Sequence, residues 1–294
     1  MPATTEPTPY LRPSRLDDAL ARLAEGGWSV LAGGTDFYPA RVGREVREPL
    51  LDLGAIGALR GLGEGDVDGT PALRIGALTT WSELADAPLP EGLAALCQAA
   101  REVGGRQVQN QGTIGGNLCN ASPAADGVPP LLALDAVVEL ASVRGTRRVA
   151  LADFVVGNRR TTLGDGELLV AVLVPRRTAR ARSLFLKLGH RRYLVISIAM
   201  VALAADLDAD GRVRLGAAVG ACSAAARRLP ALEARVAGMV PEQLRARAES
   251  LVDASVLAPL APIDDVRASA AYRLDAARAL LARGLAELGG QLDA

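Results

Sequence analysis

Histidine and cysteine are scarce in this sequence. The chain has 294 residues but only one histidine, His190, and three cysteines, Cys97, Cys119 and Cys222, which lie far apart and form no C-x-x-C pair. These counts argue against a disulfide framework, a histidine-based catalytic triad and a multi-histidine metal site. They also argue against an iron–sulfur or zinc site held by this chain alone. We therefore expect no metal bound by its own residues.

An excess of charge and a long apolar run are also missing. Lys plus Arg and Asp plus Glu are 33 each, so the formal net charge is zero. This balance argues against a nucleic-acid binder, which needs basic residues for phosphate contacts. The most apolar segment, residues 193–205, is 13 residues long, whereas a membrane-spanning helix needs about 20. We expect no membrane span and, because the cysteines are unpaired, a cytoplasmic location.

Aromatic residues make up only 3% of the chain, whereas glycine is abundant, with 31 residues. Glycine lets the backbone turn tightly and approach a ligand closely. We therefore expect backbone loops, rather than aromatic side chains, to hold any ligand.

The spacing of apolar residues predicts an α+β chain, with glycine, proline and polar turns between its elements. Strands are predicted over residues 28–31, 49–53, 73–78, 136–142, 168–174, 183–188, 195–205 and 213–219. Helices are predicted over residues 14–25, 80–85, 92–103, 231–237, 241–252 and 270–288. Residues 61–70 and 104–120 are predicted to be turn or loop. Four arginines within residues 176–182 indicate a domain edge near residue 178.

Two glycine-rich segments are candidates for binding an anion. The first, Ala32-Gly33-Gly34-Thr35-Asp36, directly follows a predicted strand, and the second is Gly112-Thr113-Ile114-Gly115-Gly116-Asn117. Backbone N–H groups of such turns can point at one anion, for example a diphosphate. Neither segment fits the dinucleotide-binding G-x-G-x-x-G pattern or the phosphate-binding P-loop pattern. An ordinary tight turn therefore remains the alternative for each.

Four stretches carry a resemblance to a known family. They are VLAGGTDF at residues 30–37, QNQGTIGGNLCNASPAAD at residues 109–126, ELLVAVLVP at residues 167–175 and FLKLGHRR at residues 185–192. In this order they resemble the FAD-binding (medium) subunit of molybdenum hydroxylases, the family of xanthine, nicotinate and carbon monoxide dehydrogenases. The resemblance runs from about residue 8 to residue 285, and the TIGGN…SPxxD block is its most specific part.

The resemblance implies an α+β fold in two domains. Residues 1–177 would form a two-part FAD-binding domain of the vanillyl-alcohol-oxidase (PCMH) type, split near residue 60. Residues 178–294 would form a small C-terminal domain with a three-stranded antiparallel sheet and helices, like that of the carbon monoxide dehydrogenase flavoprotein.

The resemblance also implies that both glycine segments contact FAD. In the first segment the residues that would wrap the diphosphate are Leu31, Ala32, Gly33, Gly34, Thr35 and Asp36. In the second segment the residues that would meet the diphosphate and ribityl chain are Thr113, Gly115, Gly116 and Asn117.

Five further positions match residues near the cofactor in this family. Asp126 would bond a sugar or ribityl hydroxyl, although by itself it reads as a turn carboxylate. Leu169 would lie beside the flavin ring, and a core leucine is the alternative. Lys187 would lie near the isoalloxazine, where a cation raises the flavin potential by stabilising the anionic reduced form; otherwise it is a solvated strand lysine.

The two remaining positions, Val103 and Tyr193, are the weaker matches. Val103 stands where some relatives have an aromatic residue, so it can offer only apolar contact. Tyr193 lies in the loop after Lys187 and would cover one flavin face, where it could gate an electron acceptor. A tyrosine that simply leads into the following strand is the alternative.

The resemblance implies an electron-transfer flavoprotein subunit. Electrons would come from a molybdopterin cofactor in a large partner subunit, pass two [2Fe–2S] clusters in a small partner, and reach an acceptor such as NAD through FAD. We expect a dimer of heterotrimers and no catalytic residue in this chain. Two alternatives stay open: a stand-alone flavin oxidase or reductase, and a non-enzymatic scaffold that has lost FAD.

Overall fold

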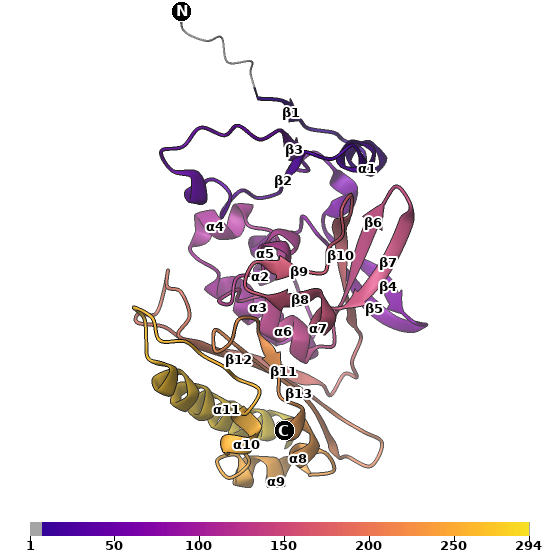
Figure 1. Ribbon diagram of the computed structural model, residues 1–294. Coiled ribbons are helices and arrows are strands. Elements are labelled where there is room, and N and C mark those ends of the chain that lie inside the picture. The colour runs from indigo at the N-terminus through magenta and orange to yellow at the C-terminus, as the bar shows by residue number, and fades with distance from the viewer. Residues whose placement is uncertain (1–7, 294) are drawn as a thin grey trace, which may run out of the picture.

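The computed structural model describes residues 8–293. The elements stack in three tiers, which follow the order of the chain from the N-terminal sheet to the long C-terminal helix (Figure 1). Each tier has its own sheet, and helices fill the space between the second and third sheets.

The first tier is a small parallel sheet covered by one helix. Its strand order is β1-β3-β2, and its elements are β1 (Tyr10–Leu11), α1 (Leu16–Ala24), β2 (Ser29–Leu31) and β3 (Leu50–Asp52). Helix α1 buries Ala19 and Leu20 in the same cluster as Leu51 of β3. Strand β2 pairs in parallel with β3, and residues 32–37 leave the sheet directly after the end of β2.

The second tier is an antiparallel sheet of order β4-β5-β10-β6-β7 with a group of short helices. Its strands are β4 (Leu62–Val67), β5 (Thr70–Gly76), β6 (Val137–Ser142), β7 (Gly145–Ala150) and β10 (Leu168–Pro175), with a separate hairpin of β8 (Val155–Gly157) and β9 (Arg160–Thr161). Its helices are α2 (Trp81–Asp86), α3 (Ala94–Glu102), α4 (Arg106–Gln111), α5 (Ile114–Asn120), α6 (Val128–Ala133) and α7 (Leu151–Phe154).

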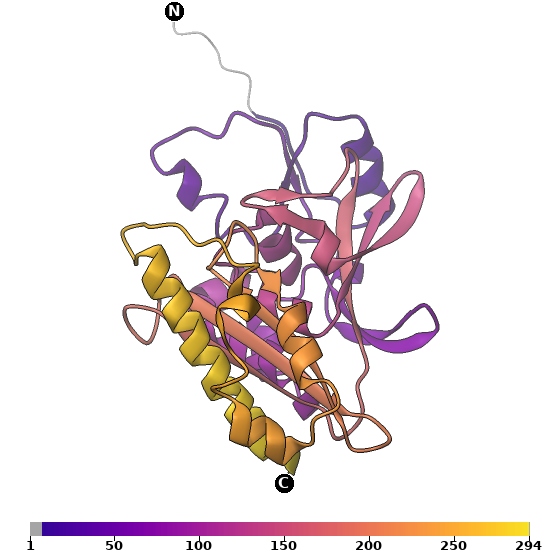
Figure 2. The same cartoon turned by 60° about the horizontal axis from the view of Figure 1, so that its bottom comes forward.

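The third tier is an antiparallel sheet of order β11-β12-β13-β14. Its strands are β11 (Arg182–Leu188), β12 (Ala199–Leu207), β13 (Val213–Gly220) and the two-residue β14 (Arg227–Arg228). Its helices are α8 (Pro230–Val236), α9 (Pro241–Arg247), α10 (Ala254–Leu257) and α11 (Ala270–Asp293). The long helix α11 lies across the outer face of the sheet (Figure 2).

Strand β12 is buried on both faces, because helices cover the sheet from both sides. Its even-numbered side chains, such as Ala202, belong to the core shared with the second-tier helices. Its odd-numbered side chains, such as Leu203, belong to the core under α11. A strand buried on both faces needs a continuous apolar sequence, which explains why this segment is the most apolar of the chain.

The structure differs from the sequence-based expectation in several segments; for example, the helix predicted over residues 241–252 ends at Arg247. Residues 104–120, predicted as a loop, form helices α4 and α5. Residues 61–70, predicted as turns, contain strand β4 and its hairpin to β5. The strand predicted from residue 195 begins only at Ala199, and the C-terminal sheet gains the short β14.

Within residues 8–293 no helix combines the length and the apolar character needed to cross a bilayer.

Candidate functional site

A cavity of about 740 Å³ lies where the first two tiers meet, and residues 194–196 close part of it. Segments that are distant in sequence form its walls: the loop after β2, the start of α5, the turn at residues 122–126 and the beginning of β10. The volume falls in the range of about 300–1,000 Å³ that is usual for small-molecule and cofactor sites.

The loop after β2 presents a row of main-chain donors with no partner in the part of the chain that the structure describes. Within residues 8–293, no acceptor bonds the N–H groups of residues 33–37. Gly34 has φ +71°, in the left-handed region that favours glycine. Alternation of right- and left-handed backbone turns successive N–H groups toward one point and so creates an anion-binding concavity.

The two glycine segments lie against each other. A Cβ atom on Gly33 would come within 1.9 Å of the Gln111 carbonyl oxygen and 3.1 Å of the Gly112 Cα. Only glycine therefore fits at residue 33, because the main chain of the second segment occupies the space of a side chain. This contact brings both predicted segments to one cavity.

The second segment differs from the first in its main-chain donors. The N–H groups of Ile114 and Gly115 donate to Thr79 and Ala77, and the N–H of Gly116 donates to the Thr113 hydroxyl at 3.1 Å. Thr113 thus caps α5, which it precedes. Gly115 is needed for close packing, because a Cβ there would lie 2.7 Å from the Ala77 carbonyl oxygen. The run of consecutive N–H groups without an acceptor in residues 8–293 therefore belongs to the first segment.

Asp126 and Lys187 form a buried ion pair at the cavity wall. The Lys187 Nζ donates to Asp126 Oδ2 at 2.8 Å and to the Glu102 carbonyl at 3.1 Å. The Ser197 hydroxyl donates to Asp126 Oδ1 at 2.9 Å. The side chains of Lys187 and Asp126 are 5% and 9% exposed. Burial raises the pKa of the Asp126 carboxyl, and the attraction of Lys187 opposes this rise.

The structure brings most of the predicted residues to this cavity. All six residues of the first segment and all four of the second line it, together with Val103, Asp126 and Leu169. Lys187 reaches it only through Asp126, and its own side chain lines a smaller neighbouring pocket with Arg191 and Arg192. Tyr193 is 63% exposed and does not line the cavity, although the three residues after it do.

Several lining residues were not predicted from the sequence. They include Arg41, Trp81, Cys119, Arg159 and residues 194–196. Cys119 could have been predicted as a lining residue, because it lies inside the TIGGN…SPxxD block. Arg159 could not have been predicted in this way, since it precedes the short strand β9, 33 positions after Asp126 in the chain.

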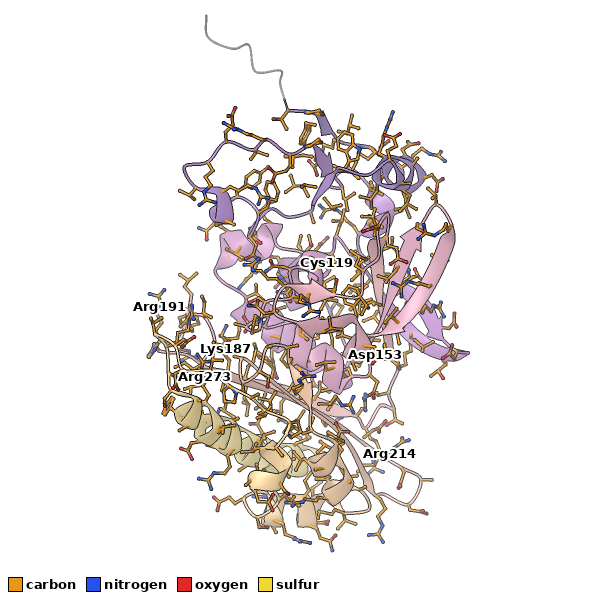
Figure 3. All side chains as sticks on the ribbon, in the orientation of Figure 1. Cys119, Asp153, Lys187, Arg191, Arg214 and Arg273 are labelled. Atoms are coloured by element: carbon orange, nitrogen blue, oxygen red, sulfur yellow. The ribbon has the colours of Figure 1, made fainter. Side chains whose placement is uncertain are left out.

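Cys119 opens to the cavity from α5 in the second tier, whereas Lys187 lies at the boundary with the third tier (Figure 3). The walls around Cys119 raise the pKa of its thiol to about 12, so the thiol is protonated near neutral pH. Within residues 8–293, no group of three or more His, Cys, Asp and Glu side chains is arranged to hold a metal ion.

The donor set fits a dinucleotide such as FAD. Free main-chain N–H groups at residues 33–37 suit a diphosphate, and leucines at residues 163, 168 and 169 offer apolar contact for a flat ring. The Asn117 carboxamide oxygen is buried and accepts no hydrogen bond from the described part of the chain. A hydroxyl of the ligand's sugar or ribityl chain could donate to it.

Comparison with known proteins gives matches over nearly the whole chain. Residues 4–177 match the family described as "FAD binding domain in molybdopterin dehydrogenase", and residues 185–288 match the "CO dehydrogenase flavoprotein C-terminal domain".

Individual relatives agree with these family matches. The xanthine dehydrogenase FAD-binding subunit of Escherichia coli O157:H7 is 32% identical over 291 residues, which cover 96% of this chain and 98% of that protein. The nicotinate dehydrogenase FAD-subunit of Eubacterium barkeri is 35% identical over 66% of each chain. A chain of reconstituted CO dehydrogenase from Oligotropha carboxidovorans superimposes with a TM-score of 0.85 and 26% identity, covering 97% of this chain and 99% of that one. The chain therefore belongs to the family of FAD-binding medium subunits of xanthine, nicotinate and carbon monoxide dehydrogenases, and it is an oxidoreductase subunit.

Proposed function

We propose that this chain is the FAD-carrying electron-transfer subunit of a multisubunit, molybdopterin-dependent dehydrogenase. In this assembly a small partner with two [2Fe–2S] clusters delivers electrons, and a large partner holds the molybdopterin. NAD is the external acceptor, and the complex is a dimer of heterotrimers. Residues 1–177 form the FAD-binding domain, with its subdivision near residue 60, and residues 178–294 form the C-terminal domain.

The row of unpartnered N–H groups at residues 33–37 is the observation that carries this proposal. Five consecutive N–H groups face a cavity, and residues 8–293 supply no acceptor for any of them. Leaving these donors unpaired is costly unless water or a ligand accepts from them. A diphosphate offers several charged acceptors, and charge-assisted hydrogen bonds to backbone N–H groups are strong. These residues therefore bind the anionic centre of the cofactor without requiring a basic patch, in keeping with the neutral composition.

The other lining residues position the cofactor. Thr113, Gly116 and Asn117 lie next to the first loop and meet the diphosphate and ribityl chain. Val103 gives apolar contact to the cofactor, and Leu169 flanks the flavin ring. Asp126 accepts from a ligand hydroxyl, while Lys187 and Ser197 hold its carboxylate in place. Residues 193–196 border the side from which an acceptor approaches.

When bound, FAD supplies the redox chemistry, because it takes up electrons singly and releases them as a pair. The chain itself contributes orientation and exclusion of water. The titratable side chains around the cavity suit this role better than acid–base catalysis: Asp126 is ion-paired and the Cys119 thiol stays protonated. This favours an electron carrier over a stand-alone oxidase.

Two further observations support the multisubunit assembly and a cytoplasmic location. Curated relatives are named as subunits or medium chains, for example the carbon monoxide dehydrogenase medium chain of Hydrogenophaga pseudoflava. Cys97, Cys119 and Cys222 are free thiols, as expected in a reducing compartment.

The test is reduction of the flavin with and without partners. The purified chain is reconstituted with FAD and mixed with purines, N-heteroaromatics, aldehydes or carbon monoxide. We expect no reduction by any of these compounds alone. We expect rapid reduction once a molybdopterin subunit and a [2Fe–2S] subunit, captured with the tagged chain and identified by mass and metal content, are present. Addition of NAD⁺ should then reoxidise the flavin.

Three outcomes would contradict the proposal. Rapid reduction by one compound with the isolated chain would identify a stand-alone oxidase or reductase. A colourless preparation that excess FAD cannot reconstitute would identify a scaffold without cofactor. Reoxidation by a quinone or oxygen but not by NAD⁺ would reject NAD as the acceptor.

A further inference from the structure

Four charged side chains line the cavity: Asp36, Arg41, Asp126 and Arg159. Two of them are neutralised by the protein. The Arg41 Nε donates to Glu48 Oε1 at 2.8 Å, and Asp126 pairs with Lys187. In the described part of the chain, no carboxylate pairs with the Arg159 guanidinium, whose Nη1 donates to the carboxamide oxygen of Asn120 at 2.7 Å. Arg159 is therefore the lining cation that keeps its full charge.

The main chain holds Arg159 in an uncommon conformation. Its φ is +53°, in the left-handed region that side-chain-bearing residues rarely adopt. The Arg159 N–H donates to the Ala121 carbonyl at 2.9 Å, and the β8–β9 hairpin fixes the residues on either side. Such backbone strain persists only where surrounding contacts determine it, and it is frequent at functional sites.

These contacts place Arg159 at one end of the cavity. Asn120 and Ala121 are at the C-terminal end of α5, whereas Thr113 and Gly116 are at its start. Seven helical residues span about 10 Å, so Arg159 is about that far from the end where residues 33–37 present their free N–H groups. Helix α5 contacts both β9 and β10, and Leu168 and Leu169 at the start of β10 line the same cavity.

We propose that Arg159 is the cation that sets the reduction potential of the flavin bound in this cavity, in place of Lys187. The proposal rests on the proposed function, which puts the diphosphate at residues 33–37 and the ring beside Leu169. A guanidinium stays charged at all relevant pH values, and a cation near the ring stabilises the anionic reduced form. Lys187 contributes less, because Asp126 cancels its charge at 2.8 Å.

The experiment measures the two-electron midpoint potential of bound FAD by spectroscopic titration with reference dyes. Arg159→Met removes the charge and Arg159→Lys keeps it. Arg160→Met is the matched control, because Arg160 is exposed on the same hairpin and does not line the cavity. The double variant Lys187→Met with Asp126→Asn removes a pair without net charge.

We expect Arg159→Met to disfavour the reduced flavin about tenfold, which is about 30 mV for a two-electron couple. Screening by water at this exposed site keeps the effect from being larger. Arg159→Lys should stay near the wild-type potential, Arg160→Met should match the wild type, and the double variant should shift less than Arg159→Met.

The proposal is overturned if Arg159→Met holds FAD at the wild-type potential, or if Arg160→Met or the double variant shifts as much. Release of FAD by both Arg159 variants would make this residue an anchor of the cofactor and would equally overturn it. Wild-type protein that binds no FAD would instead overturn the proposed function itself.

Discussion

The ion pair between Lys187 and Asp126 joins the third tier to the cavity wall. The two residues are 61 positions apart in the chain, and no sequence pattern links them. The sequence predicted both as site residues through the family resemblance alone. Lys187 pairs with Asp126 because β11 packs against the end of α3. This packing is a tertiary contact, which could not be predicted from the sequence.

Removing one partner of this pair should destabilise the protein. Lys187→Met leaves the Asp126 carboxylate buried without a countercharge, so we expect a loss of about 3–5 kcal/mol in the free energy of unfolding. Adding Asp126→Asn removes the orphaned charge and should restore part of the loss. Urea denaturation of the two single variants and the double variant measures this coupling. Equal stability of Lys187→Met and the wild type would contradict the ion pair.

Gly116 tests the second glycine segment. A Cβ there would lie 3.0 Å from Thr113 Oγ1 and 3.9 Å from the Ala32 Cβ, and both residues line the cavity. We expect Gly116→Val to weaken FAD binding at least about tenfold, or about 1.4 kcal/mol, by filling space at the cavity wall. Flavin fluorescence gives the dissociation constant and circular dichroism checks the fold.

Gly57→Ala is the control for Gly116→Val, because a Cβ at residue 57 meets nothing within 4 Å. Unchanged FAD affinity in the Gly116 variant would remove this residue from the site.

At the scale of elements, the sequence predicted the long apolar strands and missed the short polar ones. The apolar patterns of residues 168–174, 183–188 and 213–219 predicted strands β10, β11 and β13. Helices α4 and α5 span only six and seven residues, a length at which an isolated helix is unstable in water. Two glycines and two asparagines lower the helix propensity of α5 further. Tertiary burial and the Thr113 cap stabilise them instead. Strand β4, with the sequence LGEGDV, is similarly maintained by its pairing with β5.

Strand β10 begins next to a carboxylate whose ionisation stabilises the fold. Glu167 accepts from the Arg147 guanidinium at 2.7 Å and from the Gly164 N–H at 2.7 Å. The hydrogen bond from Arg147 is the main cause that lowers the Glu167 pKa from 4.5 to about 2. Because the folded-state pKa is depressed, this stabilisation is complete above about pH 4.5 and disappears as the pH falls toward 2.

We therefore expect Glu167→Gln to cost about 1–2 kcal/mol at neutral pH. This figure is reduced from that of a fully buried pair, because Arg147 is 45% exposed and water screens it. The difference from the wild type should narrow as the pH is lowered below 4.5, as followed by urea denaturation at several pH values. A difference independent of pH would show that the charge of Glu167 has no such role.

Helix α11 contains a matched pair of glycines for testing its contact with α9. A Cβ at Gly289 would lie 2.8 Å from the Arg245 nitrogen and 2.9 Å from the Pro241 carbonyl oxygen, whereas a Cβ at Gly290 meets nothing within 4 Å. We expect Gly289→Ala to lower stability by about 1–3 kcal/mol. Gly290→Ala should raise it by up to about 1 kcal/mol through helix propensity. Thermal unfolding compares the two, and the same sign for both would contradict the close α9–α11 contact.

On the scale of the whole molecule, the cavity depends on both proposed domains. Residues 194–196 line it and Lys187 holds Asp126, although all four lie beyond the boundary expected at residue 177. We expect a fragment of residues 1–177 to retain no FAD, since it lacks these residues and exposes the helix surface that β11 covers. Gel filtration with absorbance at the flavin band tests this, with the full chain as control. A yellow, monomeric fragment would show that the first domain suffices.

The even-numbered and odd-numbered side chains of β12 are anchored in different cores, so parting the lower sheet from the helices above it would leave one entire face of that strand in water. A hinge motion that separates the third tier from the second-tier helices therefore costs much free energy. Residues 189–198 belong to no helix or strand and include three residues of the cavity wall. We therefore expect a bound cofactor to enter and leave past residues 189–198, while the second and third tiers stay packed together.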